Sequence, residues 1–499
     1  MQMEVLRDLV DRGAGSLLLL LPQNFSDIHG ELAQQWRELE RSILSQKIPI
    51  PVYLSLEEET LGVIHDSLAS SAAREKHSTV TASLWHILTG YGYQMISEDQ
   101  KEAEVVKDSH VVTLVGKLAG GLGVQQRLPT VMVVAHYDAF GAAPSLSSGV
   151  DSNASGVAAL LGLARLFSRL YRDVKQKPRS NLLFVLSGGG KLNYFGTKSL
   201  LEEDNDDLDS LIHSSDYIIC LDSLAATAAS QSCDQSHDES HDQSHDPPHS
   251  LTVHVSKPPK EGSKAAVMLD LLNRSFSQLS SGPLRMVHKK IRLSDDLLSW
   301  EHERFSLKRL PAATISALCH HGDPRRQSMF VNSDHIDVEG LTQNVAALAD
   351  GLARYLYNLS SLLGTEGERE GGERMATLPT VSSEYVSAWL DYLASHSRSP
   401  QLLTEDHPLV TGLYQAMSQS LQDVTKLVQR PEKSDPEFVL YHIPQTTLHA
   451  HKVKSPIFDL FVAVGVALYL CLWYSLIEFF PWSAVGFIPL PLKVKSSKS

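Results

Sequence analysis

Four side chains could bind divalent metal ions near the ends of predicted strands. His136 and Asp138 end the apolar run "TVMVVAHYD", Asp151 follows on the next loop, and Asp222 ends the later run "DYIICLDS". Hydrolysis of a peptide bond by paired zinc ions needs imidazole and carboxylate ligands, a carboxylate that bridges the metals and a free carboxylate as general base. Each residue alone is explained equally well as a cap or turn residue. Their order along the chain favours a site derived from a metallopeptidase.

A sheet whose strands end at one edge is needed to bring these residues together. Apolar runs rich in β-branched residues end at His136, Ser187, Asp222 and Ser316, which is typical of parallel strands covered on both faces. Helical periodicity follows these runs over 157–170, 265–279 and about 335–357. The alternation predicts a three-layer α/β domain with a parallel-rich central sheet, in which ligands collect at the carboxyl ends of the strands.

The composition excludes some classes of protein. The 499 residues are 42% apolar and 20% charged, with a net charge of −14 at pH 7. Such a chain can bury a large core, and without a dense basic cluster it is not suited to bind nucleic acid. The cysteines are scattered without the spacing of a zinc site or a disulfide framework, and we interpret them as buried or unreactive thiols: Cys220, Cys233, Cys319 and Cys471.

A membrane segment is predicted near the C-terminus. Residues 460–480 are almost wholly apolar, and 21 residues at about 1.5 Å each reach roughly 30 Å, the thickness of a bilayer core. Lysines on both sides favour a cytosolic C-terminus only slightly. The first 22 residues lack the positive charge and long apolar core of a signal peptide. Either the chain is tail-anchored with a cytosolic domain, or it is a short form of a longer protein.

Asn-x-Ser triplets indicate a luminal location when they accompany a membrane segment. They occur at Asn24, Asn153, Asn273 and Asn358. We expect glycans at Asn153 and Asn358, and a glycan at Asn153 would crowd the mouth of the predicted site.

The predicted organisation has five parts. Within the second part the Ser-His-Asp-rich tract 230–250 is expected to be a disordered insertion, because it has almost no apolar residues to bury. Two amphipathic helices are expected in the third part, from "SEYVSAWLDYLASH" and "TGLYQAMSQSLQDVTKLV". The predicted parts are a partial α/β unit over 1–73, the main α/β domain over 74–363, a linker with juxtamembrane helices over 364–456, a transmembrane helix over 457–482 and a short basic tail over 483–499.

Several motifs together resemble one superfamily. "AHYDAFG", "DSNASG", "SGGGKLNYFGT", "CLDS", "WEHERF" and "LPAATIS" are similar to the zinc aminopeptidase and transferrin-receptor superfamily. Within it the chain resembles the nicalin family, inactive relatives of nicastrin, over essentially its whole length. The resemblance implies an aminopeptidase-like fold with a helical juxtamembrane segment and one C-terminal transmembrane helix.

The resemblance also assigns roles to the candidate residues. His136 corresponds to a metal ligand, Asp138 to the residue that orients it, Asp151 to the bridging aspartate and Asp222 to a later acidic ligand.

Three further positions of the family motif have lost their functional residues. Counting back from Gly196, the general-base glutamate and the second-metal glutamate of the family fall on Gly190 and Lys191. The final histidine ligand falls near Gln327. These replacements predict a pseudo-peptidase without catalytic residues, metal or cofactor, in which the Lys191 ammonium pairs with Asp151 or Asp138 as a counter-ion.

The resemblance implies a role in a membrane complex. We expect a non-catalytic, single-pass glycoprotein of the endoplasmic reticulum whose large domain is luminal. Its partners would be Nodal modulator, a multispanning membrane protein and the Sec translocon, where the complex assists insertion of multi-pass membrane proteins; antagonism of Nodal signalling is also implied. Two alternatives remain: a peptidase with one zinc ion held by His136, Asp151 and Asp222, and a substrate-docking receptor in the manner of nicastrin.

Overall fold

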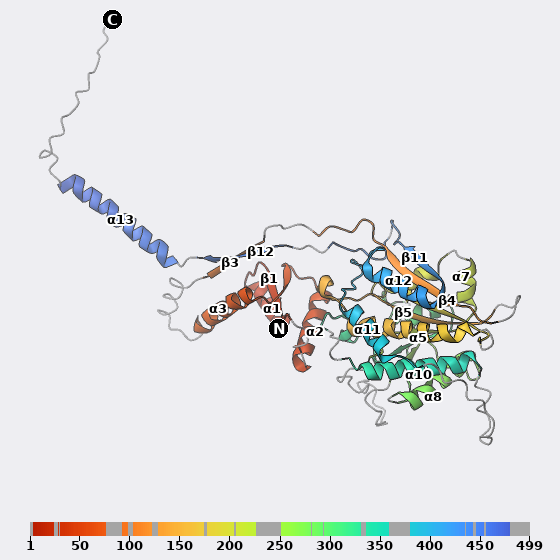
Figure 1. Cartoon of the computed structure of the whole chain (residues 1–499). Helices are drawn as coiled ribbons and strands as arrows, with labels where there is room; N and C mark the ends of the chain where they lie inside the picture. The colour runs from red at the N-terminus through yellow and green to blue at the C-terminus, as the bar shows by residue number, and fades with distance from the viewer. Residues whose placement is uncertain are drawn as a thin grey trace, which may run out of the picture. The chain divides into compact units, whose positions relative to one another are not determined.

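The computed structural model divides the chain into two compact units (Figure 1). Unit 1 comprises Met1–Ser55 and Ala103–Ile443, and unit 2 comprises Leu56–Glu102 and Pro444–Ser499. Within these limits the structure describes residues 3–23, 28, 30–75, 92–97, 103–121, 128–173, 177–203, 206–225, 251–280, 282–292, 294–330, 336–358, 380–434, 436–442, 446–453 and 456–479. The tract 230–250, the glycine-rich part of the linker and the tail 483–499 lie outside the described residues.

An eight-stranded mixed sheet forms the centre of unit 1, in the order β11-β4-β6-β5-β7-β10-β8-β9. The four strands β6, β5, β7 and β10 pair in parallel, and β8 pairs in parallel with β9. The pairs β11–β4, β4–β6 and β10–β8 are antiparallel. The strands are β4 (Val111–Leu118), β5 (Thr130–His136), β6 (Asn181–Ser187), β7 (Ser215–Leu221), β8 (Thr252–Val255), β9 (Arg285–His288), β10 (Ala312–Ser316) and β11 (Gln422–Gln429). The expected parallel-rich centre is confirmed, with antiparallel strands toward both edges.

Helices cover both faces of this sheet, as continuous apolar strands require. In β5, Val131 and Val133 pack into the larger apolar cluster, whereas Met132 and Val134 pack into the smaller one on the opposite face. The larger cluster is covered by α5 (Ser155–Arg172), α8 (Lys264–Leu279), α10 (Val338–Leu356), α11 (Ser383–Ala394) and α12 (Pro408–Ser420). The other face carries α6 (Phe195–Leu200), α7 (Asp206–His213) and α9 (His302–Leu307).

The region after the linker belongs to this domain, which corrects the predicted boundary at residue 363. Side chains of α11 and α12, including Leu390 and Leu413, are buried in the larger apolar cluster with α5. The second predicted helix, 411–428, is also wrong in its last eight residues, because α12 ends at Ser420 and the chain then forms β11. Pairing with β4 at the sheet edge decides the conformation of this stretch, and an amphipathic pattern alone does not reveal a pairing partner.

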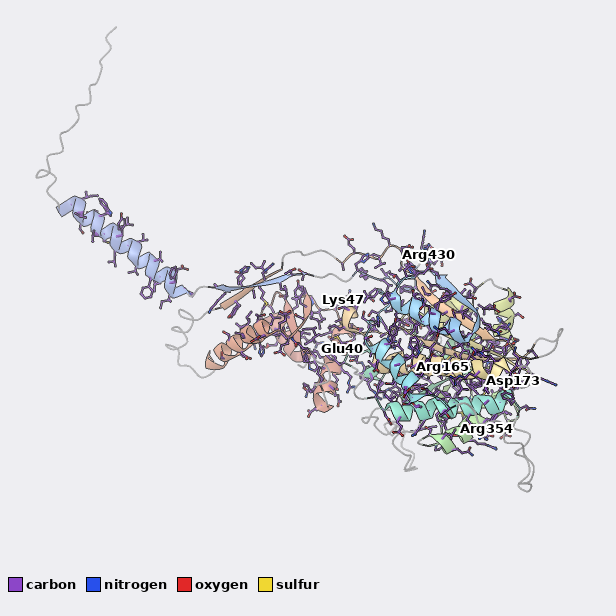
Figure 2. The ribbon with its side chains drawn as sticks, viewed as in Figure 1. Glu40, Lys47, Arg165, Asp173, Arg354 and Arg430 are labelled. Carbon is purple, nitrogen blue, oxygen red and sulfur yellow. The ribbon has the colours of Figure 1, made fainter. Side chains whose placement is uncertain are left out.

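The N-terminal elements belong to unit 1 up to Ser55, so the predicted 1–73 unit is not a separate body. They are α1 (Met3–Asp11), β1 (Leu17–Leu21), α2 (Gly30–Ser45) and β2 (Val52–Leu56), with β1 and β2 forming a two-stranded sheet. Glu40 of α2, labelled in Figure 2, is buried. Its carboxylate accepts the backbone N–H groups of Ala142 at 2.8 Å and Met329 at 3.1 Å. Glu40 therefore joins α2 to the loops that follow β5 and precede α10.

Unit 2 contains α3 (Glu59–Glu75), the antiparallel pair β3 (Gly92–Ser97) and β12 (Leu448–Val453), and α13 (Pro456–Phe479). Pro456–Glu478 is long and apolar enough to cross a membrane, with a mean hydropathy of 2.2 and no burial against the rest of the chain. Side chains project from α13 along its whole length in Figure 2. The predicted C-terminal apolar helix is confirmed.

Candidate functional site

Three of the predicted site residues meet at the carboxyl ends of β5 and β7. His136 is the last residue of β5, Asp138 follows it, and Asp222 comes directly after β7. All three are buried, at 0–2% exposure. The loop that contains Asp151 is an irregular turn, Val150–Ala154, just before α5, in which Ser152 and Asn153 have non-helical backbone dihedrals; the side chain of Asp151 lies outside the described part of the structure. The sheet thus assembles the site at the edge that the sequence predicts.

Asn153 joins the three segments that carry these residues. Its amide nitrogen donates to the carbonyls of His136 at 3.0 Å and Leu221 at 2.8 Å. Its amide oxygen accepts the N–H groups of Gly156 at 3.1 Å and Ser223 at 3.0 Å. The amide uses its full hydrogen-bonding capacity in a fully buried place. The glycan expected at Asn153 does not fit this arrangement, because its attachment nitrogen is buried and already donates twice.

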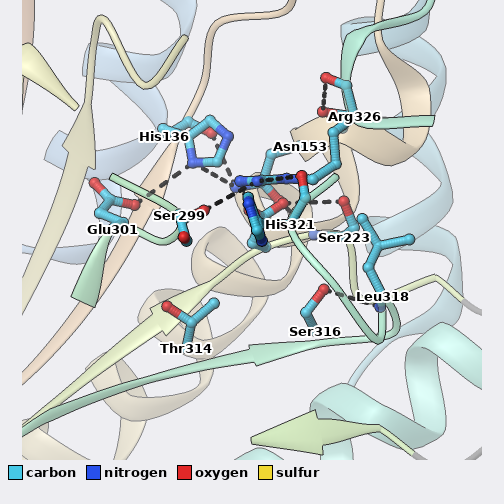
Figure 3. Close-up of polar contacts among 12 residues, drawn as sticks. His136, Asn153, Ser223, Ser299, Glu301, Thr314, Ser316, Leu318, His321 and Arg326 are labelled. Carbon is cyan, nitrogen blue, oxygen red and sulfur yellow. Dashed lines mark hydrogen bonds and ion pairs between the residues drawn. The ribbon is translucent and has the colours of Figure 1, made fainter. Parts of the chain in front are cut away.

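Glu301, which sequence analysis did not single out, contacts the imidazole of His136. One carboxylate oxygen, Oε2, lies 3.5 Å from His136 Nδ1 (Figure 3). The other, Oε1, accepts the hydroxyls of Ser187 at 2.5 Å and Thr197 at 2.6 Å. Glu301 is 2% exposed. It occupies the orienting position beside His136 that the resemblance gave to Asp138.

Asp138 instead holds the glycine-rich loop. Its two carboxylate oxygens accept the backbone N–H groups of Gly190 at 2.7 Å and Lys191 at 2.8 Å. Charge-assisted hydrogen bonds of this kind are among the stronger ones in proteins. Both oxygens of Asp138 are therefore engaged by the segment with Gly190 and Lys191, where the resemblance places the glutamates of the active family.

Gly190 lies against the ring of His136. A Cβ atom added at Gly190 would stand 2.4 Å from His136 Cγ and 2.5 Å from His136 Cβ and Cδ2, far inside van der Waals contact. The ring cannot retreat easily, because Glu301 and Asn153 lie beside it. The absence of a side chain at Gly190 is a packing requirement of this site.

The ammonium of Lys191 contacts a hydroxyl rather than the predicted carboxylate of Asp138. Lys191 Nζ donates to Ser152 Oγ at 2.6 Å, and Ser152 Oγ donates to the carbonyl of Arg326 at 2.9 Å. No ion pair joins Lys191 to Asp138. The expected alternative partner is Asp151, whose side chain lies outside the described part, so the expected ion pair stays a prediction. Burial, reinforced by the Arg326 guanidinium, lowers the pKa of Lys191 to about 8, against the opposing effect of Asp222 and Asp138.

Arg326 is the counter-ion of Asp222. Its Nη2 lies 2.6 Å from Asp222 Oδ2 and 2.8 Å from the hydroxyl of Tyr194. Its Nη1 donates to the carbonyls of Ser299 and His321, and its guanidinium lies 4.5 Å from the ring centroid of Trp300. Burial alone would raise the pKa of Asp222, but Arg326, together with His136 and Lys191, holds this pKa well below its usual range.

Gln327, the predicted register position of a final ligand, faces away from this centre. It is exposed at the end of the short helix η4 (Pro324–Gln327), whereas its neighbour Arg326 is buried. The residue that reaches the site here is therefore Arg326, one position before the expected ligand position, and its guanidinium is held by Asp222 and Tyr194.

The residues present do not fit a zinc ion. Asp222 is paired with Arg326, Asp138 is occupied by two N–H groups, and Lys191 places an ammonium nearby, which would repel a cation. His136 Nε2 is buried without a hydrogen-bond partner, but it is a single donor atom. Among the side chains that the structure describes, no three His, Cys, Asp or Glu residues are grouped closely enough to hold a metal.

The chain is similar to known proteins over most of its length. Residues 114–357 match the family described as Peptidase family M28. The chain is 38% identical to "BOS complex subunit ncln" of Danio rerio over 488 residues, covering 94% of this chain and 80% of the relative. It is 35% identical to "BOS complex subunit NCLN" of Homo sapiens over 472 residues, covering 94% and 79%.

The chain belongs to the nicalin family. This confirms the resemblance drawn from the motifs. The crystal structure of nicastrin, the γ-secretase component, shares the fold of this nicalin-family chain, with a TM-score of 0.52 at 9% identity over 91% of this chain and 94% of nicastrin. At that identity the similarity extends to the fold alone.

Glu301 and Arg326, which hold His136 and Asp222 in the site of this nicalin-family chain, were not among the residues predicted from the sequence. Glu301 lies in the quoted motif "WEHERF", and Arg326 is adjacent to the predicted position Gln327. A charged residue inside an apolar motif, or beside a lost ligand, is the signal that could have indicated them. It does not indicate which partner each charge meets.

Proposed function

We propose that this chain is a non-catalytic subunit of a membrane complex of the endoplasmic reticulum. The complex would contain Nodal modulator and a multispanning membrane protein, act at the Sec translocon and assist the insertion of multi-pass membrane proteins. The observation that carries the proposal is the identity of 35–38% to proteins named as BOS complex subunits, over 94% of the chain. Antagonism of Nodal signalling, which the resemblance also implies, can be tested with a Nodal reporter in cells that lack the chain.

The site supports a role without catalysis. A general base must have a free carboxylate or imidazole within reach of a substrate. The carboxylates of Asp138 and Asp222 are hydrogen-bonded within the protein, and Glu301 Oε1 accepts two hydroxyls. Glu301 Oε2 and His136 Nε2 have no hydrogen-bond partner among the described residues, but both are buried inside the domain. At the strand ends these carboxylates bind groups of the neighbouring loops instead of a substrate. A domain held together in this way would offer a fixed surface for assembly with partners.

Co-purification tests membership in the complex. Full-length chain with an affinity tag, extracted from membranes in mild detergent, is expected to retain Nodal modulator and a multispanning partner in fixed ratio. A matched sample with the apolar helix α13 replaced by an unrelated membrane span shows which contacts need that helix. Recovery of the chain alone, or with newly made polypeptides only, would contradict a stable subunit and favour a docking receptor.

Two features of unit 1 support a luminal domain. Cys319 is disulfide-bonded, which corrects its interpretation as a buried or unreactive thiol, and disulfides persist in oxidising compartments. Asn358 is exposed just after α10, where an oligosaccharyltransferase could reach it. We propose that the large domain lies in the lumen and that Asn358 carries the glycan.

The expected topology can be measured in microsomes. Endoglycosidase treatment should increase the mobility of the full-length chain, and Asn358→Gln should remove that shift. Cys319 should resist alkylation until a reductant is added. Free alkylation of Cys319 in intact cells, together with an unglycosylated Asn358, would place the domain in the cytosol.

A further inference from the structure

The two-stranded ribbon of β3 and β12 lies directly before the apolar helix in the chain. Its strands pair over their full length, from Leu448 opposite Ser97 to Val453 opposite Gly92. Only residues 454 and 455 separate β12 from α13, which begins at Pro456. At about 3.8 Å between consecutive Cα atoms, Val453 lies at most about 11 Å from Pro456.

The position of the apolar run in α13 sets how deep the junction between β12 and α13 lies in the membrane. Asp459 is the last charged residue before a stretch from Leu460 that stays apolar up to Glu478. The 18 residues Leu460–Ile477 rise about 27 Å, close to the roughly 30 Å of a bilayer core. Pro456–Asp459 then lies among the lipid headgroups. The ribbon must begin at the membrane surface.

The ribbon exposes an amphipathic face. Residues directly opposite one another share a face, so Tyr93 with Lys452 and Met95 with Ala450 lie on one side. On the other side Gly92 is opposite Val453, Gln94 is opposite His451 and Ile96 is opposite His449. That side has Ile96 and Val453 as its larger apolar side chains, 45% and 44% exposed, whereas the first side has Tyr93, Met95 and Leu448. The first side combines an aromatic residue, a flexible apolar residue and a lysine at its edge, which is the composition found at membrane interfaces.

Among the described residues, neither strand of this ribbon contributes to an apolar cluster. Met95 is 39% exposed, and Tyr93 and Leu448 on the same face are half-buried. A lone two-stranded sheet is only marginally stable in water. Burial of the apolar face of the ribbon in surroundings less polar than water would stabilise the ribbon.

We propose that the face formed by Tyr93, Met95, Leu448, Ala450 and Lys452 lies flat on the lipid bilayer beside α13, with its apolar side chains in the headgroup region. The apolar residues are spread along the ribbon rather than gathered at the end next to α13, so a flat orientation buries more of them than an upright one. The inference rests on the proposed membrane span. The ribbon would then fix the height and rotation of the chain at the membrane surface.

Site-specific photo-crosslinking tests the proposal in the full-length chain in native membranes. A benzoylphenylalanine at position 95 is expected to form lipid adducts, detected by mass spectrometry, with a yield several times that of the same probe at Gln94, its neighbour on the opposite face. A probe at Ala450 provides a second reading from the same face. Equal yields at the two faces, or protein adducts in place of lipid adducts at position 95, would overturn the proposal.

A probe at Leu468 separates this inference from the membrane span itself. Leu468 lies in the middle of α13 and is 65% exposed. Lipid adducts at Leu468 without lipid adducts at Met95 would disprove the ribbon contact alone. Absence of lipid adducts at both positions would disprove the membrane span and, with it, the proposed single-pass topology.

Discussion

The variant Gly190→Glu is expected to destabilise the protein and to remain without peptidase activity, although it restores the glutamate that the superfamily motif places there. The new Cβ would meet His136 Cγ at 2.4 Å, and inserting atoms into a close-packed core typically costs about 1–3 kcal/mol and occasionally more. A buried carboxylate without a counter-ion adds a further desolvation cost. Thermal unfolding of the detergent-solubilised chain and an aminopeptidase assay with added zinc measure the two effects.

Gly322→Ala provides the matched control for this substitution. Gly322 has nothing within 4 Å of an added Cβ, so this variant should unfold at the wild-type temperature. A Gly190→Glu protein with wild-type stability and zinc-dependent hydrolysis would show that the site is a dormant enzyme rather than a repacked one.

Arg326→Met is the second substitution with a large expected effect. It leaves the carboxylate of Asp222 buried without its ion-pair partner, and breaking a buried pair in this way typically costs about 3–5 kcal/mol. It also removes the hydrogen bond from Arg326 to Tyr194. The free energy of unfolding, measured with denaturant, should fall accordingly.

A double variant distinguishes the lost ion pair from lost packing. Asp222→Asn added to Arg326→Met removes the uncompensated charge, so the two substitutions together should cost less than the sum of each alone. Arg274→Met is the control, because Arg274 and Asp270 form an exposed pair on α8, and exposed pairs contribute about 0.2–1 kcal/mol. Additive costs at Arg326 and Asp222 would argue against an energetically coupled pair.

The same pair predicts how stability depends on pH. The pKa of Asp222 is well below its usual range in the folded chain, so the folded state binds this proton less readily than the unfolded state. The contribution of Asp222 is therefore fully present above the unfolded pKa, near 4. It is lost as the pH falls further, and the double variant should lack this part of the acid sensitivity.

Local patterns predicted the fold better than they predicted the contacts. The strands ending at His136, Ser187 and Asp222 are continuous apolar runs, and the sheet places their ends together as expected. The strand β11 was predicted as helix, because its partner β4 lies some 300 positions earlier in the chain and leaves no local signal. Long-range pairing is the information that one sequence lacks.

For the site as well, the sequence predicted which segments come together better than it predicted the contacts between their side chains. The replacement of the active family's carboxylates by Gly190 and Lys191 stays a prediction that rests on the resemblance. The sequence did not reveal that Gly190 makes room for the His136 ring, or that Arg326 neutralises Asp222. Both are contacts between segments far apart in the chain, and their geometry depends on loops whose conformation has no periodic pattern.

The amide of Asn153 has a consequence for biosynthesis. The sequon Asn-Ala-Ser is accessible only while the chain is unfolded, because in the folded protein its nitrogen lies between the ends of β5 and β7. A chain that received a sugar there during translocation could not close the three-segment junction. In the lumen, where we propose that the domain folds, oligosaccharide transfer to Asn153 would therefore compete with folding of this junction, and a molecule modified there could not reach the native state.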